Sequence, residues 1–265
     1  MSVVVHHLNC GCMCPPIAKI LPGMLPKTFC CHCLLVETKE RLILVDAGIS
    51  TLDCDDPSRI GLTHRLFRFQ LDKLNTAKGQ VESLGFSVDD VSDIILTHLD
   101  GDHASGICDF PHANIHVTPK ELEVARAQKT AEHRIRYRTH YLGDDVNYVP
   151  MEPWSSESWE SFDRVQGTAL SDAVRIVDLP GHTPGHVGVA VQTDAGWLLH
   201  AGDAYFHHSK LDSGRNAYRM LDVFERQAHM AVPEAAESFA RVRAAREEMK
   251  VVCSHDATFF PDLKV

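Results

Sequence analysis

The sequence contains no hydrophobic run that approaches the ~20 residues needed to cross a membrane. It also has no excess of basic residues, since 26 Lys and Arg stand against 36 Asp and Glu and the formal net charge is −10. Because phosphate backbones repel a chain of this charge, nucleic-acid binding is not expected. The first residues lack the basic start and long apolar core of a secretory signal, so we expect a cytoplasmic protein without membrane contact.

Cysteine, by contrast, is abundant. Six of the nine cysteines fall in two clusters, Cys10, Cys12 and Cys14, then Cys30, Cys31 and Cys33. An odd total in a reducing compartment argues against a disulfide framework. The spacing also differs from the Cys-x₂-Cys pairs of structural zinc sites. We expect reduced thiols in strands and loops near a pocket. An additional metal site is the alternative, which a metal content above two per chain would favour.

Four potential metal ligands stand within six residues, directly after the apolar run at 94–96: His98, Asp100, Asp102 and His103. An apolar run that ends in such a cluster predicts a buried strand that delivers ligands at its C-terminal end. Imidazole and carboxylate groups are the usual ligands of hydrolytic zinc, iron or manganese sites. The alternative is a polar strand-to-helix loop in which Asp102 caps the helix.

Three later segments also place a His or Asp at the end of a predicted strand. They are residues 180–186 (PGHTPGH), residues 200–204 (HAGDA) and residues 253–256 (CSHD), which contribute His182, Asp203 and His255. Since ligands so far apart in sequence must converge in space, we expect a single domain over residues 1–265.

In order and content these motifs, with an Asp-x-Gly at Asp46, resemble the metallo-β-lactamase superfamily from about Leu34 to His255. The resemblance implies an α/β fold, a four-layer αβ/βα sandwich with metals at one edge between two sheets. It implies two divalent ions, one held by His98, Asp100 and His182, the other by Asp102, His103 and His255, with Asp203 bridging. A metal-bound hydroxide would then be the nucleophile, and Asp102 would orient the water or pass a proton.

One position departs from the family's usual His-x-His-x-Asp-His motif, because Asp100 stands where the second His is expected. Asp100 either ligates directly, which we favour, or falls short of the metal, or reaches it through a water. Direct ligation would create a set of two histidines and one carboxylate, which suits iron or manganese. We expect zinc first, with iron and manganese as alternatives.

Other polar residues near the motifs are assigned supporting roles. We expect His186 and Asp46 to orient ligands rather than bind metal. Tyr205 is a candidate to stabilise a developing oxyanion, although its spacing after Asp203 is one residue tighter than in lactone-cleaving relatives. The alternative for Tyr205 is packing at the pocket edge. Whether His207 and His208 line the pocket is left open.

The resemblance is closest to the lactonase-like branch and implies hydrolysis of a small-molecule lactone or small ester. A thioester hydrolase of the glyoxalase II type is one alternative, and an iron-dependent oxidoreductase such as a sulfur dioxygenase is another. A binding protein with a degraded site is a third class. A β-lactam substrate is disfavoured because both carboxylate ligands would be unusual there, and the oligomeric state is left open.

Apolar periodicity predicts the main elements. We expect strands over 3–8, 30–37, 41–46, 91–97, 112–117, 173–178, 187–192, 197–201 and 249–253, and helices over 71–84, 119–127 and 234–250. A loop over 15–27 is expected to cover the active site. The irregular stretch 134–161, rich in Arg, Tyr and Trp, is expected to shape substrate binding, with surface packing as the alternative.

Overall fold

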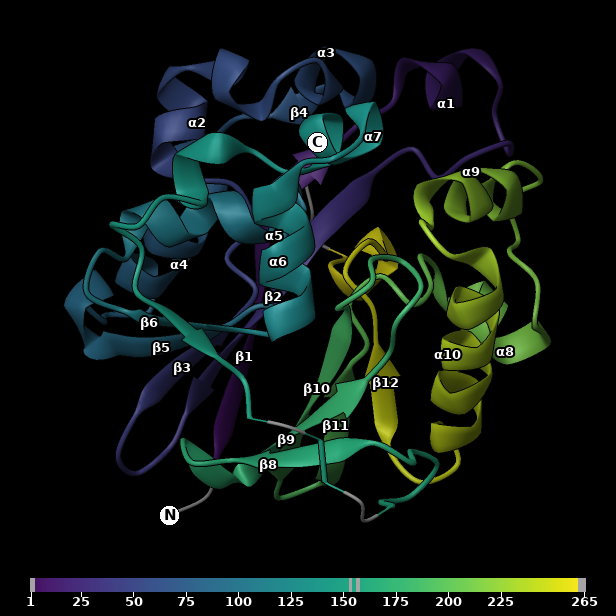
Figure 1. Cartoon of the computed structure of the whole chain (residues 1–265). Helices are drawn as coiled ribbons and strands as arrows, with labels where there is room; N and C mark the ends of the chain where they lie inside the picture. The colour runs from purple at the N-terminus through teal and green to yellow at the C-terminus, as the bar shows by residue number, and fades with distance from the viewer. Residues whose placement is uncertain (1–2, 153, 156–157, 262–265) are drawn as a thin grey trace.

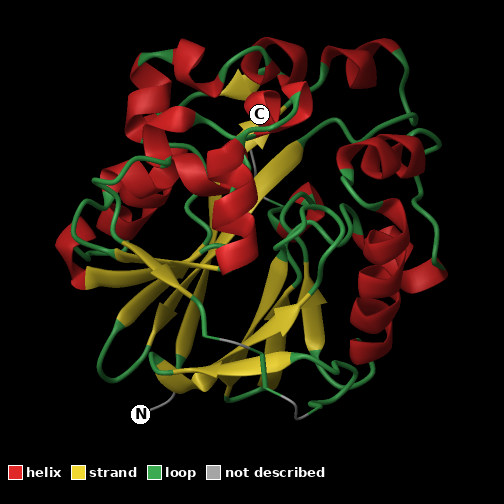
Figure 2. Cartoon of the chain, viewed as in Figure 1, coloured by secondary structure: helices red, strands yellow, loops and turns green. Residues whose placement is uncertain are grey.

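Two β-sheets face each other across an apolar interior in the computed structural model, which describes residues 3–152, 154–155 and 158–261 (Figure 1; Figure 2). The first sheet has the strand order β4-β1-β2-β3-β5-β6-β7, and the second has the order β12-β11-β10-β9-β8. The strands of the first sheet are β1 (Val4–Met13), β2 (Phe29–Glu37), β3 (Leu42–Val45), β4 (Phe69–Gln70), β5 (Val91–Ile95), β6 (Asn114–Val117) and β7 (Tyr148–Pro150). Those of the second are β8 (Val165–Thr168), β9 (Ser171–Asp178), β10 (Val187–Thr193), β11 (Gly196–His200) and β12 (Lys250–Val252).

Helices cover the outer face of each sheet (Figure 1). The α-helices are α1 (Pro16–Ile20), α2 (Thr51–Asp55), α3 (Thr63–Phe67), α4 (Ala77–Ser83), α5 (Gly101–Ala104), α6 (Pro119–Ala127), α7 (Ala131–Arg136), α8 (His208–Ser213), α9 (Leu221–Ala228) and α10 (Val232–Ala245). Short 3₁₀ turns are η1 (Pro57–Ile60), η2 (Lys73–Asn75), η3 (Val88–Asp90), η4 (Ser105–Asp109), η5 (Thr139–Tyr141) and η6 (Ala257–Phe259).

Successive side chains of a strand point to opposite faces of its sheet, and this alternation produces the layers. In β2, Leu34 and Val36 join the cluster between the two sheets, whereas Leu35 packs outward under α4 and α6. Val189 and Val191 of β10 face the same inner cluster. The outer face of the second sheet packs against α10 and α8. The predicted four-layer αβ/βα sandwich is therefore confirmed.

The first strand is longer than predicted. Its register against β2 shifts between Asn9 and Cys12, and Gly11 at φ 139° lies in this irregularity. A bulge of this kind lets pairing continue beyond an interruption, so β1 extends to Met13 and also pairs with β4. Cys12 lies opposite Cys30 across the two strands.

Two other predictions need correction. The helix expected over 71–84 is divided into η2 and α4, because the Thr76 side chain accepts a hydrogen bond from the Gly79 N–H and starts a new helix. The loop over 15–27 contains α1, which begins with Pro16 at its first turn. None of residues 15–27, all of which the structure describes, lines the metal-centre cavity described below. The expectation that this loop covers the active site is therefore wrong.

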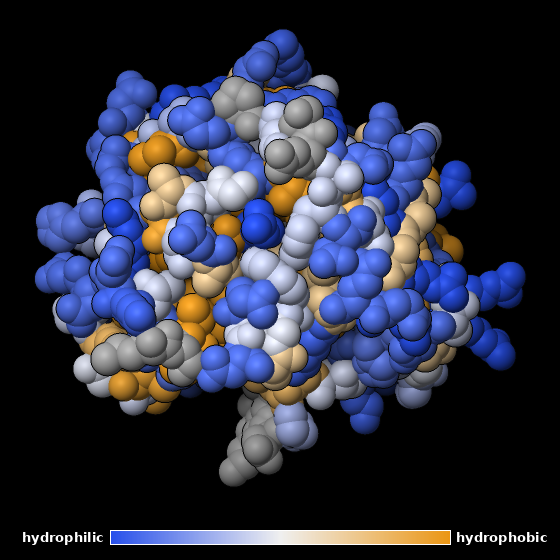
Figure 3. All heavy atoms as spheres, turned by 90° about the horizontal axis from the view of Figure 1, so that it is seen from below, coloured by the Kyte–Doolittle hydropathy of each residue, from blue (hydrophilic) through white to orange (hydrophobic). Residues whose placement is uncertain are grey.

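The outer surface is mainly polar on the face shown in Figure 3, where apolar residues occupy separate small areas. Within the described residues, no helix combines the length and the apolar character that a membrane crossing requires.

Candidate metal centre and active site

The central ligand loop begins where β5 ends. The buried Asp46 carboxylate accepts hydrogen bonds from the Thr97 N–H at 2.7 Å and from the Thr97 hydroxyl. These contacts fix the chain just before His98 and Asp100. Helix α5 then begins at Gly101 and presents Asp102 and His103. The ligand segment is thus held by a carboxylate that lies outside the ligand set.

The remaining ligands come from loops of the second sheet. His182 lies between β9 and β10, Asp203 follows β11, and His255 follows β12. The Val187 N–H donates to the Thr97 carbonyl at 2.9 Å, so the loops of the two sheets are joined directly beside the site. The structure brings together all seven residues that the sequence analysis assigned to metal.

The first ligand group consists of His98, Asp100 and His182. Asp100 Oδ2 lies 3.3 Å from His98 Nε2 and 3.1 Å from His182 Nε2. The second group consists of Asp102, His103 and His255, in which Asp102 Oδ2 lies 3.9 Å from His103 Nε2 and 3.7 Å from His255 Nε2. Atoms that share a metal at bond lengths of ~2.0–2.2 Å are separated by distances of this order.

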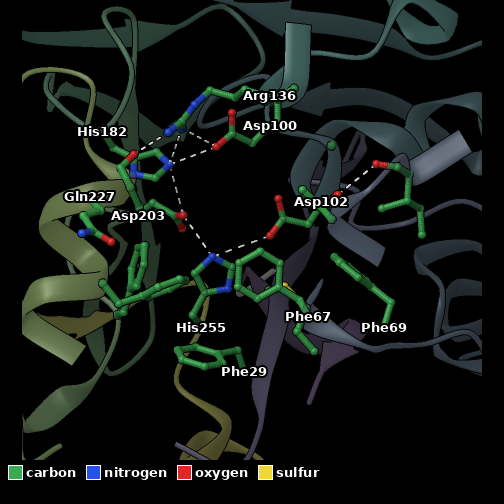
Figure 4. Close-up of a pocket in the computed structure, with 18 of the residues that line it drawn as sticks. Phe29, Phe67, Phe69, Asp100, Asp102, Arg136, His182, Asp203, Gln227 and His255 are labelled. Carbon is green, nitrogen blue, oxygen red and sulfur yellow. Dashed lines mark hydrogen bonds and ion pairs between the residues drawn. The ribbon is translucent and has the colours of Figure 1, made fainter. Parts of the chain in front are cut away.

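Asp203 lies between the two groups (Figure 4). Its Oδ1 is 3.4 Å from His103 Nε2, and its Oδ2 is 3.0 Å from His255 Nε2 and 3.4 Å from His182 Nε2. Burial raises the pKa of Asp203, but the nearby His255 and His103 outweigh that effect and hold the pKa well below its usual value. The carboxylate is therefore placed and charged as a bridge.

The donor set fits divalent metal ions. His98 Nε2, His103 Nε2, Asp100 Oδ1 and Asp203 Oδ1 are buried without a hydrogen-bond partner. Unpaired buried polar atoms are costly, and those of His98, His103 and Asp203, which lie together in one ligand group, are accounted for by cations. Imidazole and carboxylate donors suit zinc, iron or manganese.

Contacts of the opposite ring nitrogens orient the histidines. His103 Nδ1 lies 2.9 Å from Asp46 Oδ2, and His255 Nδ1 lies 2.8 Å from the Cys30 carbonyl. Because carboxylates and carbonyls accept, each Nδ1 carries the proton and each Nε2 keeps its lone pair toward the site. Asp46 therefore positions both the loop and a ligand, as the sequence analysis expected.

His186 lies outside the ligand groups, as expected. Its Nε2 accepts a hydrogen bond from the Asp203 N–H at 2.9 Å, and its Nδ1 lies 2.8 Å from the Leu179 carbonyl. Burial lowers the pKa of His186 to about 4, so the ring is neutral and can accept at Nε2. His186 thus fixes the backbone of the bridging residue.

Tyr205 is not placed for the catalytic role considered above. Its ring is buried beneath the second sheet, with its centroid 6.1 Å from that of Phe239 on α10. The next residue, Phe206, faces the cavity instead, and it has no hydroxyl. The phenol of Tyr205 thus lies in the core, and the prediction that it acts as an oxyanion donor is wrong.

His207 and His208 also lie away from the metal-centre cavity. With Asp256 they form a separate group of potential ligands. Both Asp256 oxygens are already hydrogen-bonded, one by the Thr258 N–H and hydroxyl and the other by the His208 N–H and ring. The Asp256 carboxylate is therefore satisfied within the protein, whereas His207 Nε2 is buried without a hydrogen-bond partner.

The clustered cysteines are buried free thiols, as expected. Burial raises the pKa of Cys12 to about 11 and that of Cys30 and Cys31 well above the usual value. No group of potential metal ligands among the described residues includes a cysteine. The thiols therefore act as small apolar core residues.

Glu121 is a supporting residue that sequence reasoning missed. Its buried carboxylate accepts from the Leu99 N–H and the Gly185 N–H, each at 3.1 Å, and so joins the two loops that carry His98 and His182. Burial raises the pKa of Glu121 from 4.5 to about 6, although hydrogen bonds, that of Thr183 first, oppose the rise. No local pattern marks this residue, because its partners are distant in sequence.

We expect this shift to make stability depend on pH. Because the pKa is higher in the folded state, neutral Glu121 contributes stability that is fully present below pH 4.5 and is lost as pH rises through about 6. The free energy of unfolding should fall by about 2 kcal/mol over this pH range. Urea unfolding of the metal-free protein should show that Glu121→Gln lacks this decline, whereas Glu123→Gln, at an exposed position of α6, keeps it. Parallel profiles for both variants would contradict the assignment.

The ligand groups open into a cavity of about 460 Å³ (Figure 4). Much of its wall is apolar, from Met13, Phe29, Ile60, Phe67, Phe69, Ile135, Phe206 and Phe224. Polar wall residues include Thr63, Arg136, Arg138 and Gln227.

From the stretch 134–161, Arg136 and Arg138 therefore line the cavity, whereas Tyr137 and Tyr141 are buried by packing. Residues 153 and 156–157 of that stretch lie outside the described residues.

Fold and site together define an αβ/βα protein with a candidate two-metal centre at the junction of its sheets. The family model of the metallo-beta-lactamase superfamily matches residues 29–255, and the chain belongs to that superfamily. As a member it is a hydrolase, and membership implies divalent metal ions.

Curated relatives include probable metallo-hydrolases of Mycobacterium bovis and Mycobacterium tuberculosis, each 36% identical over 98% of this chain and 81% of theirs. An N-acyl homoserine lactonase of Bacillus thuringiensis is 29% identical over 66% of this chain and 63% of its own. Among solved structures, an N-acyl homoserine lactone hydrolase with N-hexanoyl-L-homoserine bound at its catalytic metal center aligns with a TM-score of 0.73 and 22% identity, covering 100% and 98% of the two chains. AidC, a dizinc quorum-quenching lactonase, aligns with a TM-score of 0.60 and 17% identity over 96% and 87%. These structural similarities concern the fold.

Proposed function

We propose that this protein hydrolyses the ring ester of a lactone, or a small ester, at a centre of two divalent metal ions. One observation carries the proposal: seven ligand side chains converge, with unpaired buried atoms, at the base of a cavity with mainly apolar walls. Curated relatives named lactonases support the choice of an ester-like bond.

The two ligand groups would hold one ion each, with Asp203 shared between them. Such ions lower the pKa of water toward ~7 and polarise an ester carbonyl. Zinc is the expected metal, and iron or manganese remains compatible with the carboxylate at Asp100.

The chain's own residues bind and orient the substrate. Phe29, Phe67 and Phe69 form an aromatic wall beside the centre, where they bind the apolar part of a substrate and exclude water (Figure 4). Gln227 lines the cavity as an uncharged hydrogen-bonding group. Asp102 lies at the cavity with its side chain 19% exposed, so a carboxylate oxygen can orient a water or accept a proton.

The first test combines metal analysis with a substrate panel. Protein purified without added metal should contain two zinc or manganese ions per chain. Hydrolysis of lactones with an apolar chain should exceed that of thioesters of matched chain length. Iron together with substrate-dependent oxygen consumption would favour the oxidoreductase, and a chain with no bound metal would overturn the proposal.

A further inference from the structure

The carboxylate of Asp100 changes the charge of the first ligand group. The usual motif has a neutral imidazole at this position, so Asp100 adds one negative charge to a buried site. Burial alone raises the pKa of Asp100, yet the adjacent Arg136, together with His98 and His103, holds the pKa below its usual value. A carboxylate with a side chain only 14% exposed needs a cationic partner, and Arg136 Nη1 lies 2.6 Å from Asp100 Oδ2.

Arg136, the last residue of α7, is that partner (Figure 4). Its Nη1 donates to Asp100 Oδ2 at 2.6 Å and lies 3.0 Å from His182 Nε2. Its Nη2 donates to the Ala228 carbonyl at the end of α9. The side chain is only 11% exposed, and a guanidinium buried to this extent is stable only when it is paired.

The two oxygens of the Asp100 carboxylate have different surroundings. Oδ2 accepts from Arg136 and also lies nearest to His98 and His182, while Oδ1 is buried without a partner. A cation at the first ligand group and the guanidinium therefore compete for the negative charge of one carboxylate. Because the formal charges of Asp100 and Arg136 sum to zero, the pair has the same net charge as a neutral imidazole at this position.

We propose that Asp100 and Arg136 act as one unit in place of the missing histidine, with Arg136 a positioning residue that orients Asp100 and limits metal affinity at the first ligand group. This inference rests on the proposed metal centre. It accounts for a departure from the motif together with a buried arginine that the proposed hydrolysis does not otherwise use.

The test is a titration of metal-free protein with Zn²⁺ against a chromogenic chelator, which yields the dissociation constant of the weaker site without an activity assay. Removing the positive charge in Arg136→Gln should tighten that site roughly tenfold, because the extra negative charge of Asp100 is no longer compensated. Arg136→Lys keeps the charge and should remain near wild type. Arg138→Gln is the matched control, since its guanidinium also borders the cavity but donates to the carbonyls of Arg59 and Arg134.

Two further variants strengthen the test, because the first changes the net charge at the site and the second restores it. Asp100→His alone leaves Arg136 uncompensated beside the site and should weaken metal binding by roughly tenfold or more. Combining Asp100→His with Arg136→Gln should restore affinity to near the wild-type value. Circular dichroism and thermal unfolding of each metal-free variant would verify folding before titration.

The outcomes separate this inference from the proposed function. If wild type binds two Zn²⁺ but Arg136→Gln and Arg136→Lys both match wild type or both bind more weakly, the inference is overturned and the metal centre stands. If Asp100→His alone binds as tightly as the double variant, the inference is likewise overturned. If wild type binds no Zn²⁺, the proposed function itself fails.

Discussion

Asp203→Asn is expected to lower hydrolysis by at least about 100-fold and to reduce metal content below one ion per chain. Even a residue that only orients a metal ligand typically contributes 10–100-fold to metal affinity or activity, and Asp203 would itself be a ligand. Asp203 is shared by both ligand groups, with Oδ1 near His103 and Oδ2 near His182 and His255. Asparagine has nearly the same shape but presents an N–H₂ group to atoms that must bind a cation, and it removes one negative charge.

Elemental analysis and steady-state kinetics of the same preparation would measure both effects. Asp194→Asn is a matched control, because Asp194 is an exposed carboxylate in the turn between β10 and β11. It should keep wild-type metal content and rate. An Asp203→Asn enzyme with two ions per chain and a normal rate would show that the bridge is assigned incorrectly.

The second large effect concerns stability and comes from Gly106 in η4. A Cβ at this position would lie 2.0 Å from the Ala47 carbonyl oxygen and 2.7 Å from its carbon, both of them backbone atoms. The Gly106 N–H also donates to the Gly48 carbonyl at 2.8 Å. Gly106→Ala must therefore push η4 away from the loop that follows Asp46, and we expect it to lower the free energy of unfolding by about 3 kcal/mol.

Urea denaturation of the metal-free variant would measure this loss. Gly167→Ala on β8 is the control, since a Cβ there meets nothing within 4 Å. Because the displaced loop holds His103 through Asp46, metal affinity should fall together with stability. Equal unfolding free energies for Gly106→Ala and Gly167→Ala would mean that the close backbone approach relaxes at little cost.

The ligands could be predicted from sequence because each follows a short apolar run, and strand ends in an α/β protein meet at one edge. The residues that hold them could not. Arg136 lies 36 positions from Asp100, and Glu121 lies 64 positions from Gly185, so only the folded chain shows these contacts.

Local spacing was also insufficient to orient side chains. Tyr205 and Phe206 are adjacent, yet Tyr205 packs against Phe239 of α10 whereas Phe206 faces the cavity. Alternation within strands was more reliable, because a strand with two buried faces must send successive side chains into different apolar layers, as Leu34 and Leu35 do.

The cavity wall and the metal ligands come from different stretches of the chain. The wall is built mainly by η1, α3, β4, α7 and α9, whereas the ligands follow β5, β11 and β12 or precede β10. Most of the side chains that would contact a substrate and those that would hold the metal ions therefore belong to separate segments, and a substitution in the wall need not disturb the ligands. Helix α7 links the two, since Ile135 belongs to the wall while the next residue, Arg136, contacts a ligand. If Arg136 acts as proposed, exchanging this helix to accommodate a new substrate is expected to change the affinity of the first ligand group for metal as well.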